Sequence, residues 1–377
     1  MRKIIITNLL ILAVFGSTCF WSVKKDRLTA SVDKILTEQA SEDEEILVLT
    51  ANDLTKEKDQ EKREGYIKWA EFTVSKFALT ESYEYDRDTY GTDRHISWID
   101  LLAWTAAHTG GKFGDDRTVC KCMEELEMEA EAGKKLEELT EDLEYFPYYR
   151  EVYETVLGGM VGEYEIEEPD AQGRKVTQKR YGLKAFHPIA KGFPYTDYDD
   201  FGASRSYGYR REHLGHDMMG QVGTPVVCVE SGYVEALGWN QYGGWRIGIR
   251  SFDKKRYYYY AHLRQGFPYQ PELKEGSVVL AGDVIGYMGH TGYSTKEDVN
   301  NIDQTHLHVG MQLIFDESQK DSDNEIWIDC YQIMGFLYRN QSETARNDET
   351  KEWRRIYEMK DPVAEKYERT QDFSMYP

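Results

Sequence analysis

Three separated segments of the sequence carry histidines and one aspartate in spacings that suit a metal site. The first contains His213 and Asp217, the second contains His262, and the third contains His306 and His308. Neutral imidazole nitrogens and carboxylate oxygens are common zinc ligands, and a catalytic zinc site keeps one coordination position open for water. These residue types therefore predict a zinc site with further polar groups around it.

Strand geometry explains how such residues could be positioned. Residues two apart in a strand share a face, so His306 and His308 are expected to point the same way, about 7 Å apart. One of them can bind the metal while the other faces the reacting groups. His213 and Asp217 are four residues apart, which places both on one side of a strand or on one face of a helix, whereas His216 points away from Asp217 in a strand.

The sequence around these residues has the pattern of short β-strands. Apolar and aromatic runs are separated by turns rich in Gly, Asn and Asp, which is typical of sheet structure. The runs are Pro225 to Val229, Tyr233 to Leu237, Trp245 to Arg250, and Arg256 to Ala261. In Tyr257 to Tyr260 the rings alternate, so two rings are expected on each side of the strand.

The order of motifs in this region resembles the lysostaphin/LytM-type zinc metallopeptidases, which mostly cut peptide bonds in bacterial peptidoglycan. The matching motifs are His213-Leu-Gly-His-Asp217, Gly223-Thr-Pro-Val226, Ser231-Gly-Tyr-Val234, Tyr260-Ala-His-Leu263, Gly282-Asp-Val-Ile-Gly286 and His306-Leu-His308. The resemblance covers residues 190–315, less than half of the chain. It implies a compact antiparallel sheet whose concave groove holds the metal.

The resemblance also implies roles for the five residues named at the outset. His213, Asp217 and His308 would bind Zn²⁺, and the catalytic residues His262 and His306 would act on the water and the transition state. Which of these two histidines serves as the general base is left open.

Two residues and one loop are candidates for contact with substrate. Tyr260 lies in the Tyr-Ala-His-Leu motif, and His290 lies in the turn Gly289-His-Thr-Gly292. In the family, the glycine-rich turn is usually followed almost at once by the His-x-His strand, whereas here Lys296 to Thr305 intervene. A longer loop at the rim of the groove is a suitable place for substrate selection.

The predicted fold class of the chain is α+β. An antiparallel β-sheet catalytic domain with a zinc groove would be preceded by a small helical accessory domain and an N-terminal membrane or export segment. Helix signals include an N-cap at Ser97 with a helix end at Gly110, and a stripe formed by Leu136, Leu139, Leu143 and Phe146. The predicted divisions are a signal peptide or membrane anchor at 1–23, a polar linker at 24–65, the helical domain at 66–165, the metallopeptidase domain at 180–345 and a charged tail at 346–377.

The N-terminus predicts export. A short basic start is followed by an apolar run from Ile4 to Trp21 and then by further basic residues. An anchor of about 18 residues is just long enough to span a bilayer, a cleaved signal peptide is the second interpretation, and Cys19 allows a lipoprotein. In each case the body of the protein would lie outside the cytoplasm, anchored through residues 4–21 at the cell surface or secreted.

The net charge restricts the partners. With 46 Lys and Arg against 67 Asp and Glu, the formal charge is −21, which argues against nucleic acid and against adhesion to anionic lipid. Together with the export signal, the family resemblance implies an exported zinc metalloendopeptidase acting on peptidoglycan stem or cross-bridge peptides. The alternative is a membrane-anchored, non-catalytic scaffold or activator that uses the same groove to bind a cell-wall or protein partner.

Overall fold

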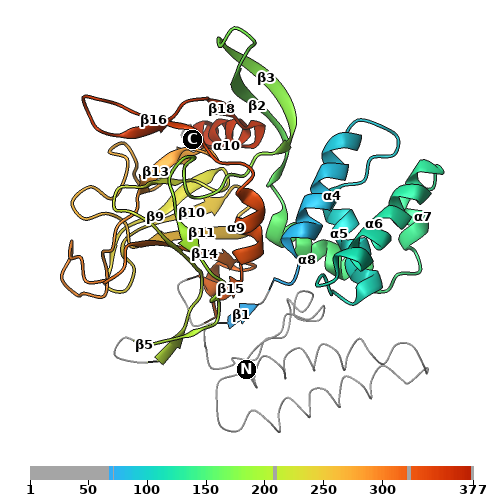
Figure 1. Cartoon of the computed structure of the whole chain (residues 1–377), viewed down its shortest axis with the longest axis horizontal. Coiled ribbons are helices and arrows are strands. Elements are labelled where there is room, and N and C mark those ends of the chain that lie inside the picture. The colour runs from blue at the N-terminus through green and yellow to red at the C-terminus, as the bar shows by residue number, and fades with distance from the viewer. Residues whose placement is uncertain (1–67, 71, 207–209, 321–323, 375–377) are drawn as a thin grey trace. The chain divides into compact units, whose positions relative to one another are not determined.

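The computed structural model describes residues 68–70, 72–206, 210–320 and 324–374 (Figure 1). The chain divides into two compact units, residues 1–64 and residues 65–377, and the second holds everything described below. The predicted signal or anchor and most of the predicted linker belong to the first unit, and both lie outside the described residues. Among the described helices, none is long and apolar enough to cross a membrane.

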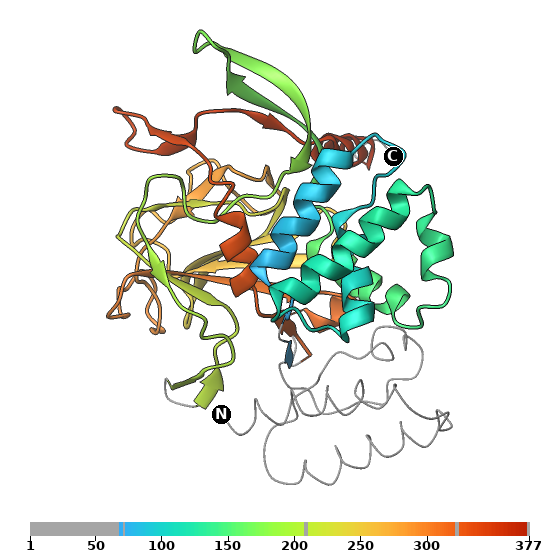
Figure 2. The same cartoon turned by 45° about the vertical axis from the view of Figure 1, so that its right-hand side comes forward.

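Five helices follow one another in the first part of the described chain (Figures 1 and 2). They are α4 (Lys76–Thr89), α5 (Trp98–Thr109), α6 (Asp116–Glu131), α7 (Leu136–Thr140) and α8 (Phe146–Leu157). The Ser97 side chain caps α5 by accepting the backbone N–H of Asp100, and Gly110 ends the helix in the left-handed conformation, as the sequence predicts.

The prediction of a single helix from the apolar stripe at 136–146 is wrong. Helix α7 ends at Thr140, and Phe146 begins the separate helix α8. No residue of α7 is buried, so tertiary packing does not extend this short helix.

The largest sheet carries the strands that hold the histidines. Its strands lie in the order β1, β15, β14, β11, β10, β9 and β12, and neighbours are antiparallel except for the parallel pair β1–β15. Strand β7 pairs with the first half of β14, and β4 pairs with β7. The bounds are β1 (Lys68–Ala70), β4 (Thr196–Asp197), β7 (His216–Met219), β9 (Gly232–Asn240), β10 (Gly244–Ser251), β11 (Arg256–Ala261), β12 (Val278–Val279), β14 (His306–Leu313) and β15 (Ile326–Ile328). The expected mixture of helices and largely antiparallel sheet is thus confirmed.

The other described strands form one three-stranded sheet and three two-stranded sheets. They are β2 (Val161–Pro169) with β3 (Lys175–Leu183) and β18 (Met359–Lys360), β5 (Ser204–Ser206) with β6 (Arg210–Glu212), β8 (Pro225–Val227) with β13 (Val284–Tyr287), and β16 (Thr344–Arg346) with β17 (Trp353–Arg355). The short elements η1 (Glu317–Gln319), α9 (Tyr331–Leu337) and α10 (Pro362–Ser374) complete the described chain. The predicted charged tail therefore contains two strands and a helix.

Polar contacts join the helices to the sheet. The Tyr83 hydroxyl accepts the backbone N–H of Leu183 at 3.2 Å. Arg256, fully buried on β11, donates to the carbonyl of Thr155 at the end of α8 and forms an ion pair with Glu230 at 2.8 Å. Because these groups are buried and mutually satisfied, the helices have a fixed place against the sheet. The division into accessory and metallopeptidase domains stays a prediction.

Candidate metal centre

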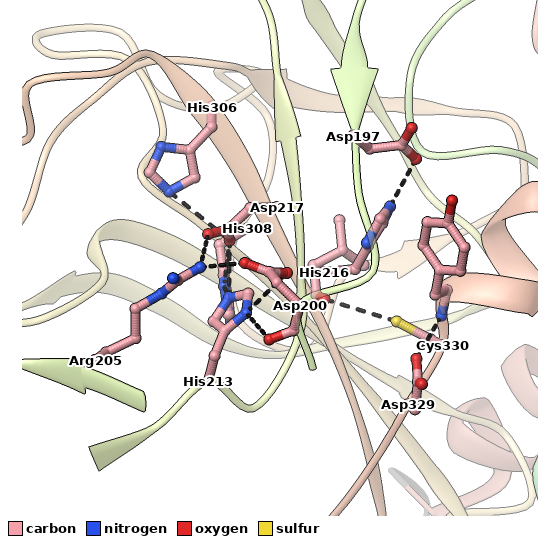
Figure 3. A network of polar contacts seen from close by, with 12 residues as sticks. Asp197, Asp200, Arg205, His213, His216, Asp217, His306, His308, Asp329 and Cys330 are labelled. Atoms are coloured by element: carbon pink, nitrogen blue, oxygen red, sulfur yellow. Dashed lines mark hydrogen bonds and ion pairs between the residues drawn. The ribbon is translucent and has the colours of Figure 1, made fainter. Parts of the chain in front are cut away.

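The ligand atoms of His213, Asp217 and His308 converge on one point (Figure 3). Asp217 on β7 is the direct register partner of His308 on β14, and His213 lies in the connection between β6 and β7. Asp217 Oδ1 lies 3.0 Å from His213 Nε2 and 2.9 Å from His308 Nδ1, and the two nitrogens are 3.1 Å apart. Three donors in this arrangement can share a metal ion.

The glycine of the first motif is explained by the packing of His308. A Cβ atom placed on Gly215 would lie 2.5 Å from His308 Cε1 and 2.6 Å from its Nε2. Any side chain at this position would push the ring out of place. A glycine between His213 and Asp217 thus lets the imidazole lie against the backbone, with Nδ1 turned toward the other two donors.

Asp200 and Arg205 extend the cluster (Figure 3). His213 Nδ1 lies 3.1 Å from Asp200 Oδ1, and Arg205 forms an ion pair with Asp200 and approaches Asp217 Oδ2 at 3.4 Å. A carboxylate that accepts the second ring N–H of a ligating histidine fixes its tautomer and orientation. Neither residue was predicted, because each lies outside the motifs, where no periodic pattern relates it to His213.

Backbone carbonyls orient the two other histidines. His262 Nδ1 lies 2.9 Å from the carbonyl of Thr291, and His306 Nδ1 lies 2.8 Å from the carbonyl of Gln304. A carbonyl can only accept, so each Nδ1 carries the proton and each Nε2 keeps a lone pair. The two rings lie 4.6 Å apart, and His306 Nε2 is 3.8 Å from Asp217 Oδ1. Two imidazoles, each held through its Nδ1 by a backbone carbonyl, therefore flank the cluster.

His262 occupies an uncommon backbone conformation. Its φ of 59° lies in the left-handed region, which costs energy for a residue with a side chain. The backbone is held on both sides, because its N–H donates to Gly243 at 2.7 Å and its carbonyl accepts from Gly289 at 3.0 Å. The fold thus imposes this direction on the ring.

Burial and charge set the protonation of the cluster before a metal binds. Burial opposes protonation of His213, but the carboxylates of Asp200 and Asp217 outweigh it and raise its pKa to about 9. Burial would raise the pKa of Asp217, yet contacts with His213 and His308 hold it well below its usual range. Burial and the neighbouring histidines lower the pKa of His262.

The remaining predicted site residues lie in different places. Tyr260 is fully buried on the opposite face of β11, where its hydroxyl accepts the N–H of Val229, and this placement does not fit contact with a substrate. The ring on the metal-facing side is that of Tyr259, 5.9 Å from the ring of His308. The residues Tyr257 to Tyr260 do alternate as expected, but the sheet register decides which rings face the metal side.

The segment from Lys296 to Thr305 is tied to its surroundings. The Asp298 carboxylate accepts from the indole N–H of Trp245 and from the backbone N–H of Gly266, both at 2.8 Å. His290 Nδ1 donates to the carbonyl of Ile302 at 2.8 Å. The end of the segment lines a cavity of about 490 Å³ together with Met219, the register partner of His306.

A comparison with known protein families matches the part of the chain that carries these residues. Residues 211–322 match the model of peptidase family M23. An L-Ala--D-Glu endopeptidase of Bacillus subtilis (strain 168) is 42% identical over 124 residues, which cover 33% of this chain and 36% of that protein. The glycyl-glycine endopeptidase ALE-1 of Staphylococcus capitis is 32% identical over 123 residues, which cover 32% of this chain and 31% of that protein. The matched stretch thus spans about a third of these relatives.

A solved structure also matches part of this chain. The catalytic domain of lysostaphin from Staphylococcus simulans is 29% identical, with a TM-score of 0.29, and the match covers 37% of this chain and 92% of that domain. The resemblance inferred from the motifs is confirmed by the family model and by the sequence relatives.

Proposed function

We propose, from the premise that residues 211–322 are a domain of peptidase family M23, that the protein is a zinc metalloendopeptidase of bacterial peptidoglycan. The observation that carries the proposal is the convergence of three ligand atoms beside two histidines whose Nε2 atoms are free to accept a proton. The names of the relatives supply the substrate class, since they are endopeptidases for L-Ala–D-Glu and glycyl-glycine bonds.

The donor set fits zinc. Two imidazole nitrogens and one carboxylate oxygen are the ligand types of catalytic zinc sites, with a fourth position left open. Ligand atoms about 2.0–2.1 Å from a tetrahedral zinc ion lie roughly 3.3 Å from one another. The three donors of His213, Asp217 and His308 are 2.9–3.1 Å apart, so small shifts would accommodate the ion. The Asp200 carboxylate would hold the His213 ring in the ligating orientation.

The two flanking histidines would carry the proton transfers. A zinc ion held by His213, Asp217 and His308 would supply Lewis-acid chemistry, polarising the scissile carbonyl and lowering the pKa of the attacking water. His262 and His306 each present an Nε2 lone pair that can accept the proton of this water, and a protonated imidazole can then donate to the leaving amine. The partner histidine can stabilise negative charge on the carbonyl oxygen once it is protonated. The low pKa of His262 makes it a weak base before substrate binds.

Export and substrate selection belong to the same proposal. Peptidoglycan lies outside the cytoplasm, so the apolar segment at residues 4–21 would export the protein, as an anchor, a cleaved signal or a lipoprotein. The loop from Lys296 to Thr305 would help to choose the peptide, because its end lines the cavity beside His306. Cell fractionation shows where the protein lies, and the mass of the mature protein shows whether its N-terminus is intact, cleaved or lipidated.

Hydrolysis of purified peptidoglycan tests the proposed activity. The full chain is incubated with sacculi, and mass spectrometry identifies the released peptides and their new termini. His308→Ala, which removes one donor, is the inactive control. Partner binding or wall binding by the intact zinc-loaded protein without any new amino termini would contradict the proposal and favour a non-catalytic scaffold.

A further inference from the structure

Two arginines near the metal centre lack the acidic partners that other arginines of this protein have. The chain carries an excess of carboxylates, and its well-buried guanidinium groups face them. The pairs are Arg250 with Glu235 and Glu317, Arg256 with Glu230 and Asp253, and Arg355 with Asp283. Arg211 and Arg246 form no ion pair with any residue in the described part of the chain, and both are half-buried.

Arg211 lies on the metal side of the short hairpin formed by β5 and β6. It is the register partner of Arg205, whose guanidinium approaches Asp217. The Arg211 side chain lies over the ring of Tyr293 at 5.2 Å and donates to its hydroxyl, and that ring is 6.0 Å from the ring of His262. The Nε atom of Arg211 is buried and has no hydrogen-bond partner among the described residues.

Arg246 reaches the same side from the middle of the sheet. On β10, Arg246 lies two residues from Gly248, and Gly248 pairs with Tyr259. On β11, Tyr259 lies two residues from Ala261, and Ala261 pairs with His308. Because residues two apart and residues in register share a face, Arg246 lies on the face of His308. Its register partner on β9 is Gly238, which has no side chain to cover it. The Nη1 atom of Arg246 is buried, again with no partner in the described part of the protein.

Both positive charges act on one group beside the metal ligands. Burial raises the pKa of Tyr259 to about 12; the guanidinium groups of Arg246 and Arg211 oppose this rise, and the carboxylate of Glu325 adds to it. The Tyr259 ring is 5.9 Å from that of His308. Two guanidinium groups and one carboxylate, that of Glu325, therefore act on Tyr259 beside the metal-ligand cluster, which leaves an excess of positive charge there.

We propose that Arg211 and Arg246 bind a free carboxylate of the peptide substrate, beside the metal centre. Buried N–H groups are almost always satisfied, and a guanidinium matches a carboxylate with two parallel hydrogen bonds. Among the described residues no carboxylate forms an ion pair with either guanidinium, so the ligand would supply one to the unpartnered N–H groups. This inference rests on the proposed peptidase function and specifies its substrate as an anionic peptide.

A pair of synthetic peptides tests the subsite. Both have the sequence L-Ala–γ-D-Glu–L-Lys–D-Ala with an amidated C-terminus, and they differ in whether the α-carboxyl of D-Glu is free or is a carboxamide. Binding is measured by calorimetry on the zinc-loaded full chain in a His306→Ala background, so that bound peptide is not consumed. The protein should bind the free carboxylate at least about tenfold more tightly, the effect expected of charge-assisted hydrogen bonds.

Substitutions assign the preference to these residues. Arg211→Gln and Arg246→Gln should each remove most of the preference, and Arg246→Lys should keep part of it. The matched control is Arg354→Gln, which removes an exposed arginine paired with Glu272 and should change nothing. Zinc content and thermal unfolding are measured on every variant, so that a collapsed site is recognised.

Three outcomes overturn the inference: equal affinity for the two peptides, no binding of either peptide, or a preference that survives in both glutamine variants. Hydrolysis by protein with His306 intact is followed separately. If the carboxylate peptide is preferred through these arginines but no natural peptide is cut, the subsite stands and the proposed peptidase function fails.

Discussion

Strand β7 places two neighbouring residues, His216 and Asp217, in clusters on opposite faces of the sheet (Figure 3). His216 Nε2 bonds to Asp197 Oδ2 at 2.9 Å, and the ring of Tyr331 covers it at 5.2 Å. Asp217 instead meets two imidazoles, those of His213 and His308. The residue types are the same on both faces, and the number of converging donors differs.

The number of converging donors distinguishes a candidate metal centre from a simple pair of histidine and aspartate. The pair of His216 and Asp197 satisfies itself, because the histidine donates to the carboxylate and the helix α9 packs against it. On the other face, the three donors come from β7, from β14 and from the segment before β7. Without a metal ion, each of these donors can only share protons with the other two. We expect the two faces to respond differently to the same kinds of substitution.

The largest effect is expected from removing a donor. Asp217→Ala or His308→Ala should abolish zinc retention and bring hydrolysis to background, because two remaining donors hold zinc poorly. His216→Ala, on the opposite face, should keep zinc. Metal analysis after dialysis measures this, and full zinc occupancy in His308→Ala would contradict the ligand assignment.

The next effect concerns the flanking histidines. His262→Ala and His306→Ala should each keep about one zinc per chain but lower kcat about 100-fold or more, since proton transfer and charge stabilisation contribute effects of this size. Steady-state kinetics on a released-amine assay measures the loss. Turnover like that of the wild type in the His262 variant would remove this residue from the mechanism.

A smaller effect is expected from Asp200. Asp200→Asn leaves the shape of the side chain but weakens its hold on the His213 ring, and zinc affinity should fall about 10- to 100-fold. Competition with a chromogenic chelator measures the affinity. The matched change Asp197→Asn beside His216 should leave the zinc affinity unaltered. An equal loss of zinc affinity in both variants would show a general effect on the sheet.

The buried histidine His187 predicts that the stability of the protein depends on pH. Burial lowers the pKa of His187 to about 4, and its ring packs between Tyr195 and Tyr338. Between pH 6.5 and about 4 the unfolded chain binds a proton that the folded chain does not, so stability falls as the pH falls through this range. The loss at pH 5 should be about 2 kcal/mol. Denaturant unfolding of wild type and His187→Gln at pH 7 and pH 5 measures it, and equal pH slopes would contradict it.

The smallest effect is expected in the loop before β14. Asp298→Ala removes the acceptor shared by Trp245 and Gly266 but touches no ligand. Zinc content should stay the same, and the proportions of released peptides should change. Product profiles on mixed muropeptides decide this, and identical profiles would exclude a role for this anchor in selection.

The family resemblance of the motifs led us to expect His213, Asp217 and His308 to lie together, and the structure brings these three residues together. The spacing of His306 and His308, and the glycine between His213 and Asp217, are properties of one strand or one turn, so the sequence displays them. Asp200 and Arg205 could not be predicted, because they reach the cluster through irregular segments with no periodicity. The choice between Tyr259 and Tyr260 depends on which face of the sheet the helices cover, and alternation alone does not determine it.

Zinc-dependent hydrolysis of peptidoglycan is tested most directly by measuring bound zinc and peptide release in the same samples. Metal-free full-length protein, prepared with a chelator, is given increasing zinc and incubated with purified sacculi. Peptide release should be absent without zinc, rise in proportion to bound zinc and stop rising at about one zinc per chain. Equal release from metal-free and zinc-loaded protein, or no release at full occupancy, would contradict it.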